Sequence, residues 1–217
     1  AYPQKYRLDK IAKIMVTDRI TSIGITPSEL SLIPMEDITD LQSIYVGGEA
    51  LPAQMMADWS AKVPYFFNGY GPTEATVDVT SVRCTPDMAN PSSIGQPHVN
   101  MRAYIVGAAD VSELMGVGVP GELVICGPQI TRGYMKLPEQ TAERFVPNPF
   151  QEKAGSSYAR MYRTGDLCRW LPDGTIGYMG RIDQQVKLRG FRIELGEIEN
   201  VLLLHERVVG CAVALQT

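Results

Sequence analysis

Apolar residues in the first 90 positions form short runs separated by longer stretches of mixed polarity. Residues 1 to 18 carry apolar side chains at helical spacing, and Pro52 is well placed to open a helix that ends at about Lys62. Three runs are expected to form strands, at Ile20 to Ile25, Leu41 to Val46 and Val63 to Phe67. Strands that alternate with helices predict an α/β layer with a largely parallel sheet.

The pattern changes from about Ser81, where short β-type runs alternate with glycine and proline turns. The string from Leu171 to Ile176 contains Asp-Gly, which predicts a tight hairpin because this pair accepts positive φ angles. An antiparallel sheet or β-barrel-like subdomain is expected here. After Asp183, a short strand and a helix near Glu197 predict a small α+β domain. The predicted core is therefore 1–182, with an α/β part at 1–90 and a β-rich part at 91–182, followed by a C-terminal subdomain that starts in 183–217.

The composition is that of a folded protein with an ordinary core, since 45% of the 217 residues are hydrophobic and 20% are charged. A net charge of −4 without blocks of like charge argues against a nucleic acid partner. The apolar run from Val208 to Leu215 contains Gly210 and is far too short to cross a bilayer, and the first residues lack a signal-like apolar core. We therefore expect a cytoplasmic protein that binds neither nucleic acid nor membrane.

Two potential cofactor signals are weak. The sequence has no Cys-x-x-Cys pair, and His98 lies far from His205, so a zinc site is disfavoured and the cysteines are expected to be buried free thiols. Gly116 to Gly121 matches G-x-G-x-x-G, but strand-forming residues follow it. A dinucleotide-binding loop needs a helix at that place, which argues against this function.

The segment from Asn68 to Glu74, Asn-Gly-Tyr-Gly-Pro-Thr-Glu, is richer in chemistry. Its glycines allow the backbone to approach a ligand, and Tyr70 offers a flat ring. Thr73 supplies a hydroxyl, and Glu74 supplies a carboxylate of the kind that binds magnesium. The segment therefore indicates a nucleotide and metal loop, with a Gly-Pro turn capped by polar residues as the alternative.

Several other strings, read together with this segment, carry a family resemblance. They are Tyr45 to Glu49, Ser93 to Pro97, Gly118 to Leu123, Thr131 to Tyr134, Pro138 to Phe145, Tyr162 to Leu167 and Gly180 to Glu199. In this order they resemble the core motifs of the acyl-adenylate-forming superfamily. They are most similar to the amino-acid-activating adenylation domains of nonribosomal peptide synthetases, over the later part of the core domain and the start of the small C-terminal domain.

The resemblance implies an ATP-dependent ligase that uses Mg²⁺ and forms an aminoacyl-AMP. It implies that Gly69 and Tyr70 lie against adenine, that Thr73 contacts phosphate and that Glu74 holds magnesium. It also implies that Asp166 accepts both ribose hydroxyls, a role that suits an ionised carboxylate. The resemblance implies that Arg181 reaches the ribose and phosphate side of the nucleotide; the alternative is that Arg181 forms a surface ion pair. Thr73, Glu74 and Arg181 are the expected catalytic group.

Two further roles follow from the same resemblance. Asp183 matches the hinge about which the small C-terminal domain turns, with a turn or helix-cap residue as the alternative. The implied amino acid pocket consists of Gly24, Tyr45, Gly47, Gly69, Val77 and Asp78. Its three glycines suggest room for a bulky side chain, whereas Asp78 suggests a polar or cationic one.

The implied partners are the amino acid, a peptidyl carrier domain that bears phosphopantetheine, and the remainder of the adenylation domain. Three family features are not in this sequence: the phosphate loop, the aspartate that binds the substrate ammonium and the C-terminal lysine. Both ends look like cuts through a longer polypeptide, so we expect this chain alone to be inactive and poorly soluble.

Two other functions stay open at this point. The chain could derive from an acyl-coenzyme A or aryl acid ligase, which shares the shorter motifs. It could also be a nonenzymatic remnant that binds nucleotide or a carrier domain.

Overall fold

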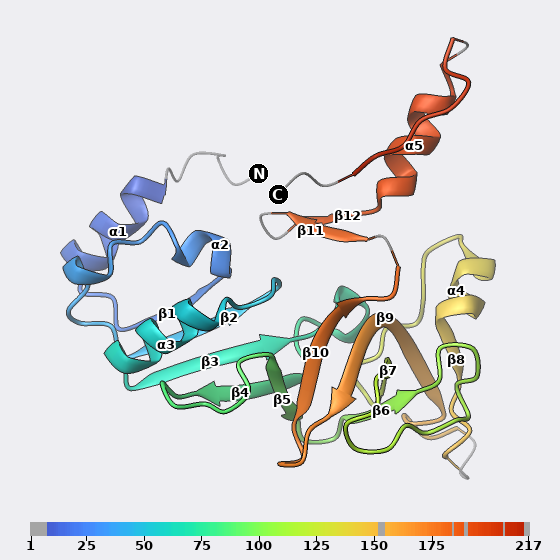
Figure 1. Ribbon diagram of the computed structural model, residues 1–217, viewed down its shortest axis with the longest axis horizontal. Coiled ribbons are helices and arrows are strands. Elements are labelled where there is room, and N and C mark those ends of the chain that lie inside the picture. Colours follow the sequence, from blue (N-terminus) through green and yellow to red (C-terminus); the bar gives the residue numbers. More distant parts are fainter. Residues whose placement is uncertain (1–7, 152–154, 184, 189–190, 206, 215–217) are drawn as a thin grey trace.

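The computed structural model describes residues 8–151, 155–183, 185–188, 191–205 and 207–214. Figure 1 shows three successive parts along the chain: a helix-covered part in blue and cyan, a strand-rich part in green to orange, and a small red C-terminal part. None of the helices in these ranges combines the length and the apolar character that crossing a membrane requires.

The first part consists of parallel strands covered by helices. Its helices are α1 (Leu8–Thr17), α2 (Pro27–Leu30) and α3 (Ala53–Lys62), with a 3-10 turn, η1 (Met35–Asp37). Its strands are β1 (Ser22–Ile25), β2 (Ser43–Gly47) and β3 (Tyr65–Tyr70), and β2 pairs in parallel with both others. The predicted parallel α/β layer is therefore confirmed. Strand β3 continues to Tyr70, beyond its expected end, because Asn68 and Gly69 still pair with β2.

Side-chain alternation gives the sheet of β1 to β3 two different faces. Ile44, Val46 and Phe66 point into a core that α1, α2 and α3 cover, and each is at most 1% exposed. Burial of one such side chain contributes roughly 1.5–3 kcal/mol. Tyr45 and Gly47, which alternate with these positions along β2, therefore belong to the opposite face.

The second part is antiparallel. Its elements are η2 (Thr73–Ala75), β4 (Thr80–Cys84), β5 (Ser93–Pro97), β6 (Arg102–Val106), β7 (Gly121–Cys126), α4 (Pro138–Arg144), β8 (Phe145–Pro147), β9 (Arg160–Trp170) and β10 (Ile176–Arg181). One sheet runs through both parts in the order β1-β2-β3-β4-β5-β10-β9-β7-β6, and β8 pairs with β9. The sheet therefore crosses residue 90 without a break, and the division at 90 and at 183 stays a prediction.

Two local predictions in this part are confirmed. The tight turn at Asp173-Gly174 joins β9 to β10, with Gly174 at φ +79°. Gly116 to Gly121 forms a loop that leads into β7 rather than into a helix. Strand β9 is long for this part, because a bulge around Gly165 lets it continue past that glycine.

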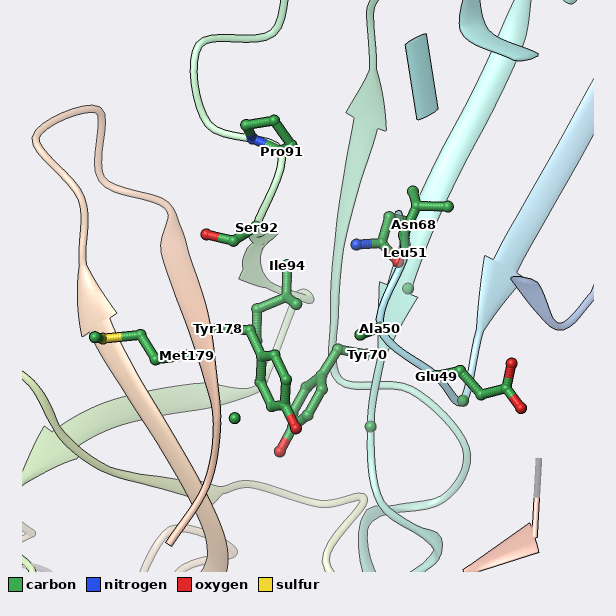
Figure 2. Close-up of a pocket in the computed structure, with 14 residues that line it drawn as sticks. Glu49, Ala50, Leu51, Asn68, Tyr70, Pro91, Ser92, Ile94, Tyr178 and Met179 are labelled. Carbon is green, nitrogen blue, oxygen red and sulfur yellow. The ribbon is translucent and has the colours of Figure 1, made fainter. Parts of the chain in front are cut away.

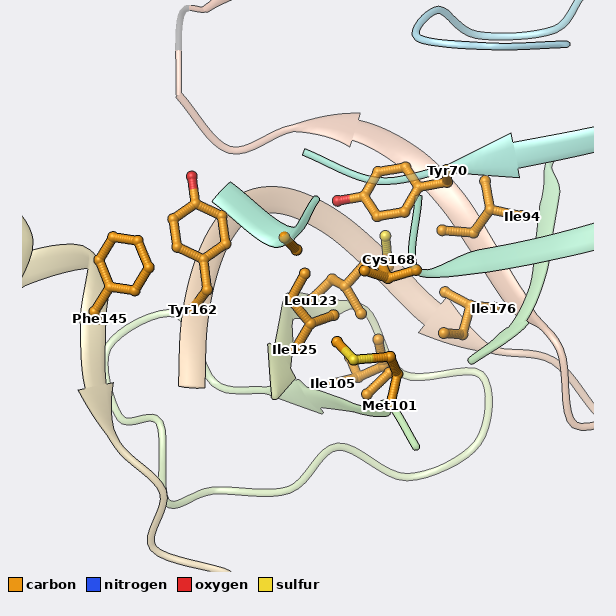
Figure 3. Close-up of a cluster of buried hydrophobic side chains, with 13 residues drawn as sticks. Tyr70, Ile94, Met101, Ile105, Leu123, Ile125, Phe145, Tyr162, Cys168 and Ile176 are labelled. Carbon is orange, nitrogen blue, oxygen red and sulfur yellow. The ribbon is translucent and has the colours of Figure 1, made fainter. Parts of the chain in front are cut away.

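The core of the second part lies on the inner side of these strands (Figure 3). Ile105, Leu123, Ile125 and Ile176 are at most 1% exposed there. Tyr70 from the end of β3 packs into the same cluster. The predicted free thiols are present, since Cys84, Cys126 and Cys168 are buried and Cys211 is half-buried.

The C-terminal part begins with a separate hairpin of β11 (Val186–Leu188) and β12 (Phe191–Ile193), followed by helix α5 (Leu195–Leu203). The expected strand and helix are therefore present. The apolar run that begins at Val208 forms no strand in its described residues, 208–214. The mixed, sheet-dominated fold agrees with the predicted fold class.

Candidate functional site

A cavity of about 300 Å³ lies where the two parts of the sheet meet (Figure 2). It is lined by Gly48, Glu49, Ala50 and Leu51 after β2, by Asn68 to Gly71 at the end of β3, by Pro91, Ser92 and Ile94 around the start of β5, and by Tyr178, Met179 and Gly180 on β10. The rings of Tyr70 and Tyr178 lie side by side with their hydroxyls at the same end, and their centroids are 6.4 Å apart. This combination of aromatic rings and exposed glycine backbone suits a flat, polar ligand.

Tyr70 connects this cavity to two charged residues. Its hydroxyl donates a hydrogen bond to Oδ2 of Asp166, on β9. Arg181, which pairs with Asp166 across β9 and β10, places Nη1 3.1 Å from Oδ1. Burial and the nearby Asp166 charge raise the pKa of Tyr70 well above its usual value, so the phenol keeps its proton and acts as the donor. The structure therefore brings together residues from three separate motifs.

The bulge in β9 fixes the position of Asp166. Gly165 has φ +71°, and its backbone N–H donates to Oε1 of Glu122 at 3.0 Å. The Thr164 hydroxyl donates to the carbonyl of Leu123 at 2.7 Å and accepts from the backbone N–H of Asp166 at 3.0 Å. The positive φ favours glycine here, and an added Cβ at Gly165 would lie only 2.8 Å from Nη2 of Arg181, which would have to move.

Arg181 also binds Asp183. Its Nε lies 2.8 Å from Oδ1 and its Nη2 lies 2.6 Å from Oδ2. Arg144 of α4 approaches the same carboxylate at 3.5 Å. Burial alone would raise the pKa of Asp183, but the hydrogen bonds and charge of Arg181 outweigh this and hold that pKa below its usual value. Asp183 is therefore an ionised carboxylate beside two cations.

Thr73 and Glu74 lie in η2, immediately after the end of β3. Thr73 is exposed, whereas Glu74 is only 6% exposed. The Tyr134 hydroxyl donates to Oε1 of Glu74 at 2.7 Å. Within the described ranges, no group of three or more His, Cys, Asp or Glu side chains is arranged to hold a metal.

The predicted amino acid group is only partly assembled. In the register of β1 to β3, Gly24 lies opposite Tyr45 and Gly47 lies opposite Gly69, on the face away from the helices. The Tyr45 hydroxyl donates to Oδ2 of Asp78 at 2.5 Å. Val77, at φ +76°, is 77% exposed.

The glycines of this group do not all provide space. A side chain at Gly69 would meet the Tyr45 hydroxyl at 2.0 Å, and one at Gly47 would meet the carbonyl of Gly69 at 2.9 Å. An added Cβ at Gly24 meets nothing within 4 Å. Tyr45 thus occupies the space in front of Gly69, and the suggested room for a bulky side chain is open only at Gly24.

Sequence reasoning assigned no site role to five residues that support these positions: Glu122, Tyr134, Arg144, Tyr178 and His98. All five lie inside or beside strings that carried the family resemblance. Their positions in or beside those strings could have marked these residues as part of the site. Their contacts with residues distant in sequence could not be predicted from the sequence.

Comparison with known proteins identifies the family of the chain. The profile of the family described as AMP-binding enzyme matches residues 2–135. The chain is 44% identical over 200 residues to tyrocidine synthase 2 of Brevibacillus parabrevis, covering 92% of this chain and 5% of that protein. It is 44% identical over 205 residues to gramicidin S synthase 2 of Brevibacillus brevis, covering 92% of this chain and 4% of that protein.

A solved structure has the same fold. It is NpsA-ThdA, an artificially fused adenylation-PCP di-domain NRPS from Klebsiella oxytoca, with a TM-score of 0.80 and 26% identity over 97% of this chain and 39% of that one. The chain belongs to the AMP-binding enzyme family, and its likeness to nonribosomal peptide synthetase adenylation domains is confirmed. It spans only a small share of the synthases it matches.

Proposed function

We propose that this chain is part of an amino-acid-activating adenylation domain in nonribosomal peptide synthesis. In the proposed reaction, a carboxylate oxygen of the amino acid attacks the α-phosphorus of ATP, and pyrophosphate leaves. The acyl group of the resulting aminoacyl-AMP then passes to a thiol. The observation that carries the proposal is the convergence of Tyr70, Asp166 and Arg181 beside the glycine-lined cavity.

The cavity fits the adenosine part of ATP. A planar base would lie against Tyr70, beside the backbone at Gly69. Asp166 is paired with Arg181, and its carboxylate oxygens would accept hydrogen bonds from the two ribose hydroxyls. Arg181 carries a positive charge on the side where ribose and phosphate would lie, and its own pKa is raised: burial opposes this, but Asp183 and Asp166 outweigh it.

Thr73 and Glu74 follow this cavity directly in the chain and are assigned to the phosphate end. Magnesium binds to proteins through one or two carboxylates plus phosphate oxygens, and Glu74 offers one such carboxylate, held in place by Tyr134. The residues present therefore fit Mg²⁺, which when bound would offset negative charge on the phosphates. Thr73, exposed at the start of η2, would donate its hydroxyl to phosphate.

The remaining assignments concern the acyl group. Gly24, Tyr45, Gly47, Gly69, Val77 and Asp78 are assigned to the amino acid, and Asp183 to the hinge between the core and the C-terminal part. The acceptor is assigned to phosphopantetheine on a peptidyl carrier domain, in keeping with the adenylation and PCP domains of NpsA-ThdA. The dependence on ATP and the free thiols fit a reducing cytoplasm.

The test is exchange of labelled pyrophosphate into ATP, measured on the polypeptide as its gene encodes it. The panel should contain the proteinogenic amino acids, ornithine, aryl acids and fatty acids, each with and without Mg²⁺. Exchange that depends on one or a few amino acids and on Mg²⁺ is expected. Exchange with an aryl or fatty acid alone would instead assign the chain to the acyl-coenzyme A or aryl acid ligases. Nucleotide binding without exchange by any acid would indicate a nonenzymatic binding protein.

A further inference from the structure

A polar cluster outside the proposed nucleotide cavity joins four residues from three segments of the chain: Tyr45, Asp78 with Ser81, and His98. The Tyr45 hydroxyl donates to Oδ2 of Asp78 at 2.5 Å. Nε2 of His98 lies 3.7 Å from the same oxygen and 3.0 Å from the Ser81 hydroxyl. Burial, reinforced by Asp78, raises the pKa of Tyr45, so this phenol remains a donor. We refer to these four residues as the Asp78 cluster.

The backbone that leads to Asp78 is strained. Thr76 has φ +58° and Val77 has φ +76°, in a region that β-branched residues rarely adopt. The Thr76 hydroxyl is tied to the carbonyl of Gln129 at 2.8 Å, and the Asp78 N–H donates to the carbonyl of Thr76 at 3.1 Å. Such strain persists where the surrounding structure enforces it, and it is concentrated at functional sites. The strained turn fixes Asp78 on the face that also carries Gly24 and Gly47.

The contacts of Asp78 leave part of its carboxylate available. Its side chain is 31% exposed, and His98 is the one basic side chain of the described residues that lies within 4 Å of its oxygens, at 3.7 Å. The contacts with Tyr45 and with His98 are both made by Oδ2, so no hydrogen bond from a described residue reaches Oδ1. No lysine or arginine of the described residues neutralises this carboxylate at ion-pair distance. A ligand with a positively charged nitrogen would supply both the missing donor and the missing charge.

The same face has open space for that ligand. An added Cβ at Gly24 meets nothing within 4 Å, whereas the space before Gly69 is filled by Tyr45. Tyr45 therefore has two effects, since it fills the space in front of Gly69 and holds Oδ2 of Asp78 by a hydrogen bond. His98 directly follows β5, and its Nε2 lies 3.7 Å from the same oxygen of Asp78.

We propose that the Asp78 cluster selects an amino acid whose side chain ends in a cationic nitrogen, and that His98 is a positioning residue that sets this specificity. The proposal rests on the proposed adenylating function. Asp78 makes the contact with the side-chain cation, while Tyr45 and His98 orient the carboxylate. The class of substrate is thus a basic amino acid such as ornithine or lysine, in preference to an apolar one of the same length.

The experiment compares matched substrates in amino-acid-dependent pyrophosphate exchange, using lysine, ornithine and the isosteric apolar norleucine. In the wild type, kcat/KM for the preferred basic substrate is expected to exceed that for norleucine by at least about tenfold. Asp78→Asn is expected to lose this preference by roughly 10- to 100-fold, mainly through KM. His98→Ala and Tyr45→Phe should each reduce the preference by about three- to tenfold, with unchanged affinity for AMP.

His205→Ala is the matched control, because His205 lies after α5 and outside the cluster. It should leave the substrate preference unchanged. If Asp78→Asn fails to fold, the Tyr45→Phe and His98→Ala variants still test the proposal, with thermal unfolding as the check of integrity. Exchange that favours norleucine and is insensitive to all three substitutions would overturn this proposal and leave the adenylating function intact. No exchange with any amino acid would instead reject the proposed function itself.

Discussion

The guanidinium of Arg181 binds both carboxylate oxygens of Asp183, with Nε 2.8 Å from Oδ1 and Nη2 2.6 Å from Oδ2. Its remaining nitrogen, Nη1, reaches Asp166 at 3.1 Å and the carbonyl of Thr164 at 2.8 Å. One side chain therefore connects the residue assigned to ribose with the residue assigned to the hinge. Asp183 lies shortly before the β11–β12 hairpin, so this ion-pair network connects the proposed nucleotide site with the proposed hinge.

Replacing Arg181 with methionine should destabilise the fold by about 3 kcal/mol or more, because it leaves two carboxylates without their main partner. The Arg181 side chain is 13% exposed and that of Asp166 is 5% exposed, so solvent compensates little. Arg19→Met is the matched control, since Arg19 pairs with Asp40 on the surface and is 78% exposed. Its effect should be much smaller than that of Arg181→Met, because a solvent-exposed ion pair contributes little to stability. Urea unfolding of both variants measures the difference, and equal effects would contradict the structural role of Arg181.

The contribution of Asp183 to stability should depend on pH. Its pKa is lowered in the folded protein, so the folded state is favoured while the carboxyl is ionised in both states. This stabilisation is present above the unfolded pKa, which is about 3.9, and it is lost as the pH falls through the folded value. The difference in unfolding free energy between the wild type and Asp183→Asn should thus be constant from about pH 7 to pH 5 and shrink below about pH 4. A difference that does not change with pH would show that Arg181 does not hold the carboxylate ionised.

Tyr70 should contribute to nucleotide affinity mainly through its ring. Tyr70→Phe keeps the ring beside the cavity and removes only the hydrogen bond to Asp166, so the Kd for AMP should rise less than about fivefold. Tyr70→Ala removes the stacking surface and should raise the Kd by roughly 10- to 100-fold. Tyr65→Ala serves as a control, because Tyr65 is 49% exposed at the other end of β3. Calorimetric titration gives all three values, and equal losses for Phe and Ala would contradict stacking.

The two glycines on the amino acid face should respond differently to alanine. Gly69→Ala forces the Tyr45 hydroxyl to move, which breaks its hydrogen bond to Asp78. Gly24→Ala meets no neighbour within 4 Å and should leave the fold unchanged. Thermal unfolding should therefore show a loss of stability for Gly69→Ala alone, of roughly 1–3 kcal/mol. If Gly69→Ala leaves the stability unchanged, Tyr45 does not lie over Gly69.

The order of elements was accessible from the sequence, whereas the contacts among the residues proposed for the nucleotide site were not. Tyr70, Asp166 and Arg181 lie in recognisable strings, and the structure brings them into contact. The expectation that a glycine leaves room for a bulky substrate side chain does not hold at Gly69. The space beside a glycine is open only if no neighbour fills it, and Tyr45 fills the space beside Gly69. Likewise, the hydrogen bond from Tyr134 to Glu74 joins residues 60 positions apart, and periodicity carries no information about such a pair.

The most direct test of the nucleotide site is a crystal structure, with bound AMP, of the polypeptide as its gene encodes it. We expect the adenine in the cavity lined by Gly69, Tyr70 and Tyr178, with both ribose hydroxyls within about 3.2 Å of the Asp166 carboxylate. Arg181 should then lie on the phosphate side of the ribose. Adenine bound elsewhere, or a ribose that makes no contact with Asp166, would contradict the assignment of this site and the function proposed from it.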